Sequence, residues 1–479
     1  MLVSVVMNFF RRQRHILFFV LGALTFWLFI NRIRQSTPKL TFEQLTDVYC
    51  NAPHKVVGEE SENAGGNLKL VQVQMLIRHG DRSPIDVKAL PNTSPVHISC
   101  RLNDSDARFH SKLQKYKAVV NHGVFSVEGS EQSSLIEERS VCSGGQLTPR
   151  GMLQHLYLGV HLKLSYHSFL QTVDVNKHVH VLSTDVPRTK QSAAALLTAL
   201  FYEYLLGDEK KAKITINVHK DHLLDSHLVL DEHEDPLSCP ALKEKWQKLL
   251  TGGAFERFKK DTRVVMENIA YYLSVGVDSL PKYNRIVDTF YTRACHNLGI
   301  PKGPKYTLPL SLIEQSFGFA HQYSTIRHSG EIAELQTLSL LSQIAKQSVY
   351  ILKGEENLKK VVVYSGHDSM IHPFLQIMNE KFVKWPPYAS RIVFELYADP
   401  AVSTGDKEVL NKAFFRILYN GEPITYIKFL GEPQGEMKLY RLSGLLNHVT
   451  DSVRDDFYKH EITILSELLF TRIQTLCEK

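Results

Sequence analysis

The sequence predicts an α/β fold with a mainly parallel central sheet flanked by helices. Three apolar segments rich in β-branched residues, 71–77, 178–182 and 361–364, have the composition of strands buried inside a sheet. Helical sequence follows the last two, in the alanine-rich stretch 190–205 and in residues 370–378. Strands that alternate with helices are typical of a parallel sheet whose faces are covered by helices.

One further helix and one large insertion can be placed. Thr148 is a favourable N-cap and Pro149 is favoured at the first helical position, so a helix is expected to begin there. Residues 208–355 are too many for a single crossover between strands and are mostly helical in pattern. We therefore expect an α-helical cap inserted beside the sheet at about 208–355. Mixed strand and helix sequence resumes near residue 386.

The N-terminus predicts a membrane anchor. Residues 16–30 are apolar apart from Gly22 and Thr25, and arginines flank them on both sides. At about 1.5 Å per residue the run spans roughly 23 Å, which suits a thin early-secretory bilayer. The alternative is a cleaved signal peptide, but residues 31–34 are charged and lack small side chains at cleavage spacing.

These features give an expected domain organisation. A cytoplasmic tail at 1–14 is followed by a single transmembrane signal-anchor helix at 15–31, a stem at 32–68 and a lumenal domain at 69–479. The stem is expected because that stretch is polar, contains glycine and has few large apolar side chains.

Two features favour a lumenal position for the domain. Asn92 and Asn103 begin N-x-S glycosylation motifs in polar, loop-like sequence. An even number of cysteines is compatible with disulfides in an oxidising compartment: Cys50, Cys100, Cys142, Cys239, Cys295 and Cys477. The alternative is six buried thiols, and the sequence does not give the connectivity.

The formal net charge of +6 does not describe the folded domain. Residues 1–40 contain six arginines and lysines and no acidic residue, so they carry the entire excess and residues 41–479 sum to zero. A nucleic-acid-binding protein would spread positive charge over its folded domain. The composition therefore argues against nucleic acid as a partner.

The end of the first predicted strand is densely charged. Residues 78–84 read Arg-His-Gly-Asp-Arg-Ser-Pro and follow that strand directly. Burying these ions without partners would be costly, whereas a phosphate would satisfy them because guanidinium groups match its oxygens in geometry. The cluster predicts an anion site in which Arg78 and Arg82 bind phosphate.

Functional side chains also follow the other two predicted strands. Arg188 comes after the second strand, and His367 and Asp368 come directly after the third. Each alone has an ordinary explanation as a turn or the start of a helix. The carboxyl ends of parallel strands form the ligand crevice of such sheets, so we expect all three sites to meet at one edge. Their coincidence favours a functional site.

These residue types suit phosphoryl transfer. His79 can attack phosphorus through a neutral ring nitrogen if a backbone carbonyl fixes the proton on the other nitrogen. Nearby cations oppose protonation of His79 and keep it nucleophilic. Arg78, Arg82 and Arg188 can bind the phosphate oxygens, with His367 as a further donor.

The reaction also needs an acid for the leaving group. Asp368 can protonate the leaving alkoxide. Asp81 is the rival acid, but its position between two arginines favours an ionised partner. A metal site is the weaker interpretation of four histidines in the insertion, because no pair has the helix spacing of a zinc enzyme: His219, His222, His227 and His233. We interpret them as a solvated polar segment.

These motifs resemble those of the histidine acid phosphatases, a branch of the phosphoglycerate-mutase-like phosphatases. The matching blocks are short motifs spread over most of residues 70–400: 78–84, 145–151, 183–185 with 188–189, 365–368, 386–390 and 395–397. The resemblance implies an α/β core with a helical cap and catalysis without a metal or other cofactor. It implies a phosphohistidine on His79, Asp368 as proton donor, and phosphate contacts from Arg78, Arg82, Arg188 and His367.

The resemblance departs from the family at Leu182, where many relatives carry an arginine, so a secondary charge at the pocket is in question. With the predicted anchor, the resemblance narrows to Golgi members that remove the 2-phosphate from xylose in the glycosaminoglycan–protein linkage region. It implies the linkage-region glucuronyltransferase as a neighbour.

The residues themselves do not select xylose. A lysophosphatidate or inositol-phosphate phosphatase is one alternative, although the zero net charge of residues 41–479 disfavours a polyphosphate. A non-catalytic phosphosugar-binding subunit of a glycosyltransferase complex is the other, although a pure binder has no need of Asp368.

Overall fold

The computed structural model describes residues 47–86, 90–104, 110–205, 212–219, 240–328, 330–378, 385–402, 409–450 and residue 475. No helix within these ranges is long and apolar enough to cross a membrane. The predicted tail at 1–14 and anchor at 15–31 lie outside them.

The described strands form one mixed sheet in the order β2-β4-β3-β5-β1-β6-β7-β8, with β9 paired to β7. The strands from β2 to β1 in this order are parallel, and the rest are antiparallel. Parallel pairing is thus confined to one half of the sheet. The bounds are β1 (Lys69–Arg78), β2 (Phe125–Glu128), β3 (Val179–Thr184), β4 (Ile214–His219), β5 (Val361–Gly366), β6 (Arg391–Ala398), β7 (Ala413–Tyr419), β8 (Glu422–Pro423) and β9 (Tyr440–Arg441).

The three strands predicted from apolar runs are β1, β3 and β5, and they are neighbours. β5 lies between the other two, with Val363 in register with Met75 on one side and Val181 on the other. The strand predicted at 178–182 begins one residue later, because His178 ends the short helix α6 (Val175–His178). All of β5 is buried, which explains why its sequence is a continuous apolar run.

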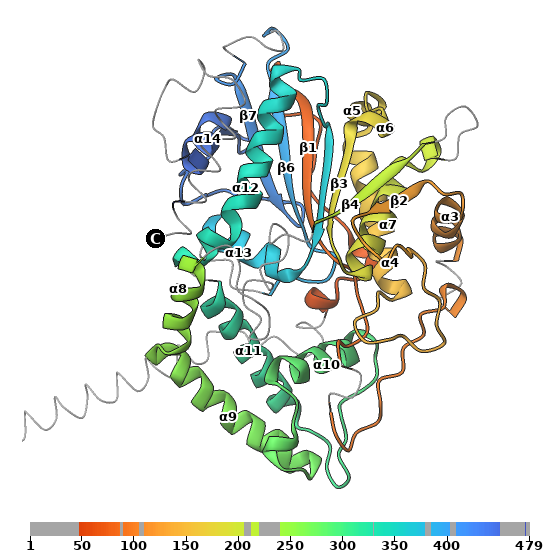
Figure 1. Cartoon of the computed structure of the whole chain (residues 1–479), viewed down its shortest axis with the longest axis vertical. Helices are drawn as coiled ribbons and strands as arrows, with labels where there is room; N and C mark the ends of the chain where they lie inside the picture. The colour runs from red at the N-terminus through yellow and green to blue at the C-terminus, as the bar shows by residue number, and fades with distance from the viewer. Residues whose placement is uncertain are drawn as a thin grey trace, which may run out of the picture. The chain divides into compact units, whose positions relative to one another are not determined.

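Helices cover both faces of the sheet (Figure 1). One face packs its alternate strand residues, such as Met75 and Val181, against α4 (Pro149–Ser165) and α7 (Pro187–Leu205). The other face packs residues such as Leu76 and Val362 against α12 (Gly330–Lys353), α13 (Asp368–Met378) and α14 (Leu442–Thr450). The remaining elements of this part are α3 (His110–Asn121), α5 (His167–Gln171) and two short 3₁₀ turns, Pro53–Lys55 and Leu102–Asp104; a third such turn, Val277–Ser279, lies in the predicted helical insertion.

The predicted helical insertion contains two elements of the central domain. β4 pairs with β3, and α12 contacts β1 and α13, so both belong to the sheet and its cover. The helices between them are α8 (Pro240–Leu250), α9 (Gly253–Leu273), α10 (Tyr283–Cys295) and α11 (Leu310–Arg327). Figure 1 shows α9, α10 and α11 grouped beyond one end of the strands, and we call α8–α11 the cap.

The described part of the predicted stem belongs to the domain. Tyr49 and Cys50 are buried, and Cys50 forms a disulfide with Cys295 at the end of α10. Glu60 is buried and accepts a hydrogen bond from Arg391 on β6. The expected division between a stem that ends at residue 68 and a domain that begins at residue 69 therefore does not coincide with a boundary in packing. The sequence does not indicate this packing, because the contacts are made by a tyrosine, a cysteine and an ion pair and not by a run of apolar residues.

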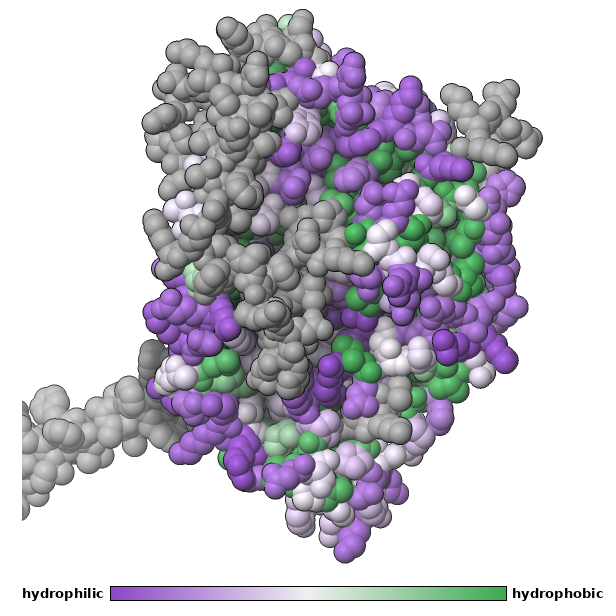
Figure 2. Space-filling model, viewed as in Figure 1, coloured by the Kyte–Doolittle hydropathy of each residue, from purple (hydrophilic) through white to green (hydrophobic). Residues whose placement is uncertain are grey.

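The four cysteines within the described ranges form two disulfides, Cys50–Cys295 and Cys100–Cys142, while Cys239 and Cys477 lie outside those ranges. Asn92, the first predicted glycosylation site, is exposed, and so is Asn103. On the face shown in Figure 2, hydrophilic residues cover much of the described surface, with smaller hydrophobic areas between them.

Candidate active site

The three predicted strand-end sites meet at one edge of the sheet. β1 and β5 are in register up to Arg78 and Gly366, and the backbone N–H of His79 donates to the carbonyl of Gly366 at 3.0 Å. The rings of His79 and His367 lie 5.4 Å apart, edge to face. His367 is also hydrogen-bonded to Thr184, the last residue of β3, at 3.1 Å. Because β1, β5 and β3 are adjacent parallel strands, the residues at their carboxyl ends meet at one site.

His79 is held in the form that a nucleophile needs. Its Nδ1 lies 2.8 Å from the carbonyl oxygen of Gly80, and because a carbonyl can only accept, Nδ1 carries the proton. Nε2 is then left with its lone pair. Burial, with Arg188, Arg78 and Arg82 around it, lowers the pKa of His79 well below the ordinary value of 6.5. The imidazole is thus neutral and able to attack an electrophile.

Arg78 is the most enclosed of the arginines, only 1% exposed. It donates to the carbonyl of Pro386 at 2.5 Å and to the hydroxyl of Tyr49 at 3.1 Å. Its guanidinium lies over the rings of Tyr388 and Tyr49, at 4.6 Å and 5.2 Å from their centroids. Burial opposes its charge, but the acidic groups around it, Tyr49 first, keep the pKa of Arg78 above its ordinary value.

Arg82 and Arg188 come from different elements. Arg82 follows β1 and forms an ion pair with Asp288 on α10, with Nη2 2.8 Å from one carboxylate oxygen. Arg188 lies in the first turn of α7, with Nη1 3.5 Å from the carbonyl of Gly145. Its charge reaches His79, because among the charged groups it has the largest effect in lowering the pKa of His79.

Several buried donors around the site have no acceptor among the described residues. They are Nε of Arg78, Nε of Arg82 and the hydroxyl of Tyr388, whose ring lies 6.0 Å from that of His79. Buried polar atoms are normally hydrogen-bonded, so such a group of donors indicates a place for an acceptor-rich ligand. A phosphate has acceptor oxygens on every side.

Asp368 lies at the start of α13, next to Arg78. One of its carboxylate oxygens is 3.6 Å from Nη2 of Arg78, and the same oxygen accepts a hydrogen bond from the indole N–H of Trp385. Its side chain is 18% exposed, so it can reach a ligand in the crevice. Sequence reasoning missed Trp385, because a lone tryptophan before two prolines carries no catalytic signal.

The comparisons with known proteins agree with this geometry. The model of the histidine phosphatase superfamily, branch 2, matches residues 69–281 and 314–420. The chain belongs to this superfamily. The match covers the three strand-end motifs and most of the cap.

Two similar proteins are distant relatives in sequence. The chain is 29% identical to 2-phosphoxylose phosphatase 1 of Xenopus tropicalis over 79% of this chain and 73% of the frog protein. It is 27% identical to counting factor 60 of Dictyostelium discoideum, over 79% of this chain and 85% of that protein. The superfamily and the frog phosphatase identify the chain as a phosphomonoesterase.

A solved structure supports the fold alone. The multiple inositol polyphosphate phosphatase of Bifidobacterium longum, in complex with inositol hexasulfate, superposes with a TM-score of 0.51 at 12% identity. The superposition covers 84% of this chain and 97% of the bacterial one.

Asp81 of this phosphatase is an ionised structural partner, as predicted, but its partners differ from those expected. Its carboxylate accepts hydrogen bonds from Thr148 at 2.6 Å and from His296 at 2.7 Å, rather than from the flanking arginines. Burial alone would raise the pKa of Asp81, but His296, Arg150 and Thr148 lower it below its ordinary value. An acid that stays ionised is a poor proton donor.

The N-terminus of α4 fixes the loop that carries His79. Thr148 caps the helix as predicted, accepting from the N–H of Gly151 at 3.1 Å. Gly80 and Gly151 touch so closely that a Cβ on Gly80 would lie 2.3 Å from the carbonyl oxygen of Gly151. Gln154 accepts from the N–H of Asp81 at 2.7 Å. This predicted structural motif therefore positions His79.

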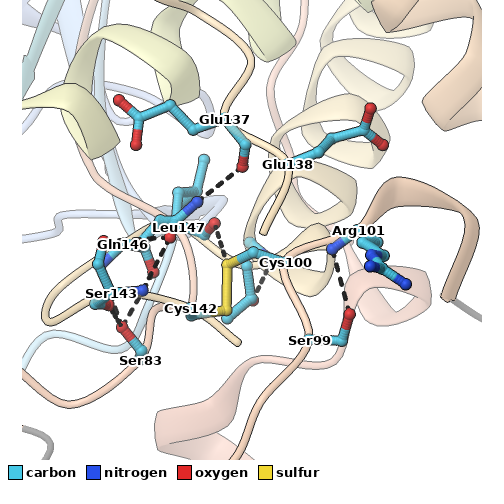
Figure 3. Close-up of a disulfide and its surroundings, with 12 residues drawn as sticks. Ser83, Ser99, Cys100, Arg101, Glu137, Glu138, Cys142, Ser143, Gln146 and Leu147 are labelled. Carbon is cyan, nitrogen blue, oxygen red and sulfur yellow. Dashed lines mark hydrogen bonds between the residues drawn. A yellow bond between two sulfur atoms is a disulfide. The ribbon is translucent and has the colours of Figure 1, made fainter. Parts of the chain in front are cut away.

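The Cys100–Cys142 disulfide supports the other end of the same loop (Figure 3). Ser143, next to Cys142, accepts a hydrogen bond from the hydroxyl of Ser83 at 2.5 Å. The N–H of Ser83 donates to Gln146, which in turn donates to the carbonyl of Glu137. The segment that follows Cys142 is thus held against the residue that follows Arg82.

A cavity of about 120 Å³ opens between the site and the cap. Arg78, Arg82 and Asp368 line it on the side of the sheet. Most of the other lining residues come from α10 and α11, with Tyr49, Ile85 and Trp385 completing the wall: Tyr283, Asn284, Arg285, Val287, Asp288, Tyr291, Ala320, Tyr323 and Arg327. A phosphate at the strand ends would place its organic group against the cap.

The remaining predictions for this region concern metal and Leu182. Within the described ranges no cluster of His, Cys, Asp or Glu side chains could hold a metal ion. Of the four histidines considered earlier, His219 ends β4 and the other three lie outside those ranges. Leu182 is buried in the core between the sheet and α12–α14.

Proposed function

We propose that this phosphatase removes the 2-phosphate of xylose in the glycosaminoglycan–protein linkage region, through a phosphohistidine on His79, and so promotes glycosaminoglycan chain synthesis. The arrangement of His79 carries the proposal: Nδ1–H is tied to the carbonyl of Gly80 and Nε2 is left among arginines. The substrate is taken from the frog relative, whose name gives 2-phosphoxylose as what it acts on.

The chemistry has two steps. Nε2 of His79 attacks phosphorus while the bond from phosphorus to the sugar oxygen breaks, and Asp368 gives that oxygen its proton. Water then attacks the phosphohistidine, its proton passes to Asp368, and inorganic phosphate leaves. Arg78, Arg82, Arg188 and His367 neutralise the charge on the phosphate oxygens in both steps.

The proposed location is the Golgi membrane, with a single type II anchor at 15–31 and the catalytic domain in the lumen. The two disulfides support an oxidising compartment, since cytosolic proteins rarely keep such bonds. Treatment of the cellular protein with an N-glycosidase should increase its mobility through loss of glycans from Asn92 or Asn103. No change in mobility, together with protease sensitivity in intact vesicles, would place the domain in the cytosol.

The test of function uses residues 41–479 as a secreted protein. It is incubated with a linkage oligosaccharide phosphorylated on xylose and, separately, with a generic aryl phosphate, and inorganic phosphate is measured. Release from the linkage oligosaccharide at much higher kcat/KM supports the proposal. Equal release would indicate a broad phosphatase, and release from neither would indicate a binding subunit. Lysophosphatidate and an inositol phosphate are the competing substrates.

The proposed partner is the linkage-region glucuronyltransferase, which would act on the product. Co-purification of the full-length chain with this enzyme from Golgi membranes is the expected result. An anchor-deleted form, tested in parallel, distinguishes a lumenal contact from one made through the membrane segment.

A further inference from the structure

Two arginines line the far wall of the cavity without carboxylate partners among the described residues. They are Arg285 on α10 and Arg327, the last residue of α11. The cations on the near wall are balanced, because Arg82 pairs with Asp288 and Arg78 lies beside Asp368. The two arginines of the lining that form no ion pair among the described residues are therefore both on the cap side.

The environment of Arg327 holds its guanidinium in place. The guanidinium carbon lies 5.3 Å from the ring of Trp246 and 5.9 Å from the ring of Tyr323. Its Nε is buried and has no acceptor among the described residues. Stacking on aromatic rings fixes an arginine without neutralising it, so this cation can still bind an anion.

The neighbouring tyrosines make the wall partly apolar. Tyr283 is anchored by its hydroxyl, which donates to the carbonyl of Ser316 at 2.8 Å, and it lines the cavity together with Tyr323 and Tyr291. Charges attract more strongly where the surroundings are less polar than water. An arginine pair in such a wall would therefore gain from an anion that enters the cavity.

We propose that Arg285 and Arg327 form a second anion subsite, which binds an acidic group on the part of the substrate that leaves after phosphate transfer. This inference rests on the proposed function, since it requires that a phosphomonoester occupies the strand-end site. The preferred substrates are then phosphomonoesters that carry a second acidic group, a carboxylate, a sulfate ester or another phosphate. A neutral sugar phosphate would use only the strand-end site.

The test compares two open-chain substrates that differ only at the end remote from phosphate. Sorbitol 6-phosphate ends in a neutral hydroxymethyl group, and 6-phosphogluconate ends in a carboxylate. For the wild-type enzyme we expect kcat/KM to be about tenfold higher for the carboxylate, from one charge-assisted contact. A phosphorylated and a sulfated analogue of the same chain then identify which acidic group is preferred.

Substitutions test whether Arg285 and Arg327 cause the preference for the carboxylate substrate. Arg285→Gln and Arg327→Gln should each reduce the preference for 6-phosphogluconate about tenfold while leaving kcat/KM for sorbitol 6-phosphate unchanged. Arg327→Lys should retain part of the preference, because the charge remains. Arg257→Gln, at an exposed position on α9, removes the same charge from the cap outside the cavity and should leave the preference intact.

The outcomes separate this inference from the proposed chemistry. Phosphate release from both substrates with equal kcat/KM, or a preference that survives both glutamine variants, would overturn the second subsite and leave the phosphatase intact. An absence of phosphate release from every substrate would instead overturn the proposed function. Activity on sorbitol 6-phosphate reports on folding of each variant.

Discussion

Asp288 on α10 holds Arg82 by two contacts, with its oxygens 2.8 Å from Nη2 and 3.1 Å from Nη1. The same carboxylate accepts from the backbone N–H of Ile85 at 2.8 Å. A cap residue thus fixes both the guanidinium of a proposed phosphate ligand and the chain that follows it. Its negative charge also lies next to the proposed phosphate site. Asp288 therefore holds Arg82 in position but weakens the attraction of the site for phosphate.

Asp288→Asn should change kcat and phosphate affinity in opposite directions. We expect kcat to fall about tenfold, because Arg82 loses one of its two fixing contacts. Inhibition by inorganic phosphate should strengthen about fivefold, because a negative charge beside the anion has been removed. Steady-state kinetics with and without phosphate measure both quantities. Glu244→Gln, which breaks an exposed pair with Lys248 on the cap, is the matched control and should change neither. A parallel fall in kcat and in phosphate affinity would show that Asp288 only supports folding.

His79→Ala should abolish turnover and preserve the fold. We expect a loss of about a thousandfold or more in kcat, because the variant has no imidazole nitrogen at the position from which Nε2 of His79 attacks phosphorus. Quenching the reaction of a substrate with a labelled phosphate group into alkaline denaturant, in which a phosphohistidine survives, should give a labelled wild-type chain and an unlabelled variant. His97→Ala, at an exposed histidine, is the control and should be labelled like the wild type. Near-wild-type activity in His79→Ala would refute the assignment of the nucleophile.

The sheet and the positions of the site residues were accessible from sequence for a physical reason. Strands buried on both faces leave continuous apolar runs, and parallel neighbours must present their carboxyl ends at the same edge. Those two rules are enough to bring His79, Arg188 and Asp368 together. They say nothing of contacts made by single residues from distant elements.

The residues that sequence reasoning missed all depend on such contacts. Tyr49 lies in a polar stretch with no periodicity, yet it is tied to α10 by the adjacent disulfide and reaches Arg78. Asp288 and Arg285 belong to an amphipathic helix whose charged face would ordinarily be assigned to solvent. Only the packing of the cap over the strand ends turns that face into a cavity wall.

The pH dependence should follow from the two groups that must hold opposite protonation states. The pKa of His79 lies well below 6.5, so the neutral nucleophile persists as the pH falls through the range in which an exposed histidine gains its proton. Activity is lost on the acid side only below that lowered pKa, and on the alkaline side when Asp368 has lost its proton. We expect a bell-shaped plot of kcat/KM with its maximum on the acid side of neutral. A rate that stays constant from about pH 5 to about pH 8 would argue against Asp368 as the acid.

Trp385→Phe should move the alkaline limb of that profile. The indole N–H donates to Asp368, and a hydrogen bond to a carboxylate favours its ionised form. Removing the donor takes away a contact that favours the carboxylate, so the limb should move to higher pH. The acid limb, set by His79, should stay in place and serves as the internal control. A change in KM with both limbs unmoved would mean that Trp385 contacts substrate without influencing the acid.

The Cys50–Cys295 disulfide should affect both stability and the site. The bonded residues are 245 positions apart, and closing a loop of that length in the unfolded chain corresponds to about 5 kcal/mol in the chain-entropy model. The bond also adjoins Tyr49 and His296, which contact Arg78 and Asp81. Replacing both cysteines by alanine should therefore lower the unfolding midpoint and, at temperatures where the protein remains folded, weaken inhibition by inorganic phosphate.

Replacing Cys100 and Cys142 is the comparison, because that bond closes a separation of only 42 residues and touches neither tyrosine nor histidine of this network. Its stability loss should be smaller, about 4 kcal/mol in the same model. Because Ser143 binds Ser83, its kinetic effect should come through the loop after Arg82 and appear mainly in kcat. Denaturant unfolding of both double variants measures the loss of stability, and inhibition by inorganic phosphate measures the effect of each disulfide on the site. Equal phosphate affinity in the two would mean that the Cys50–Cys295 bond stabilises the domain without organising the arginine beside it.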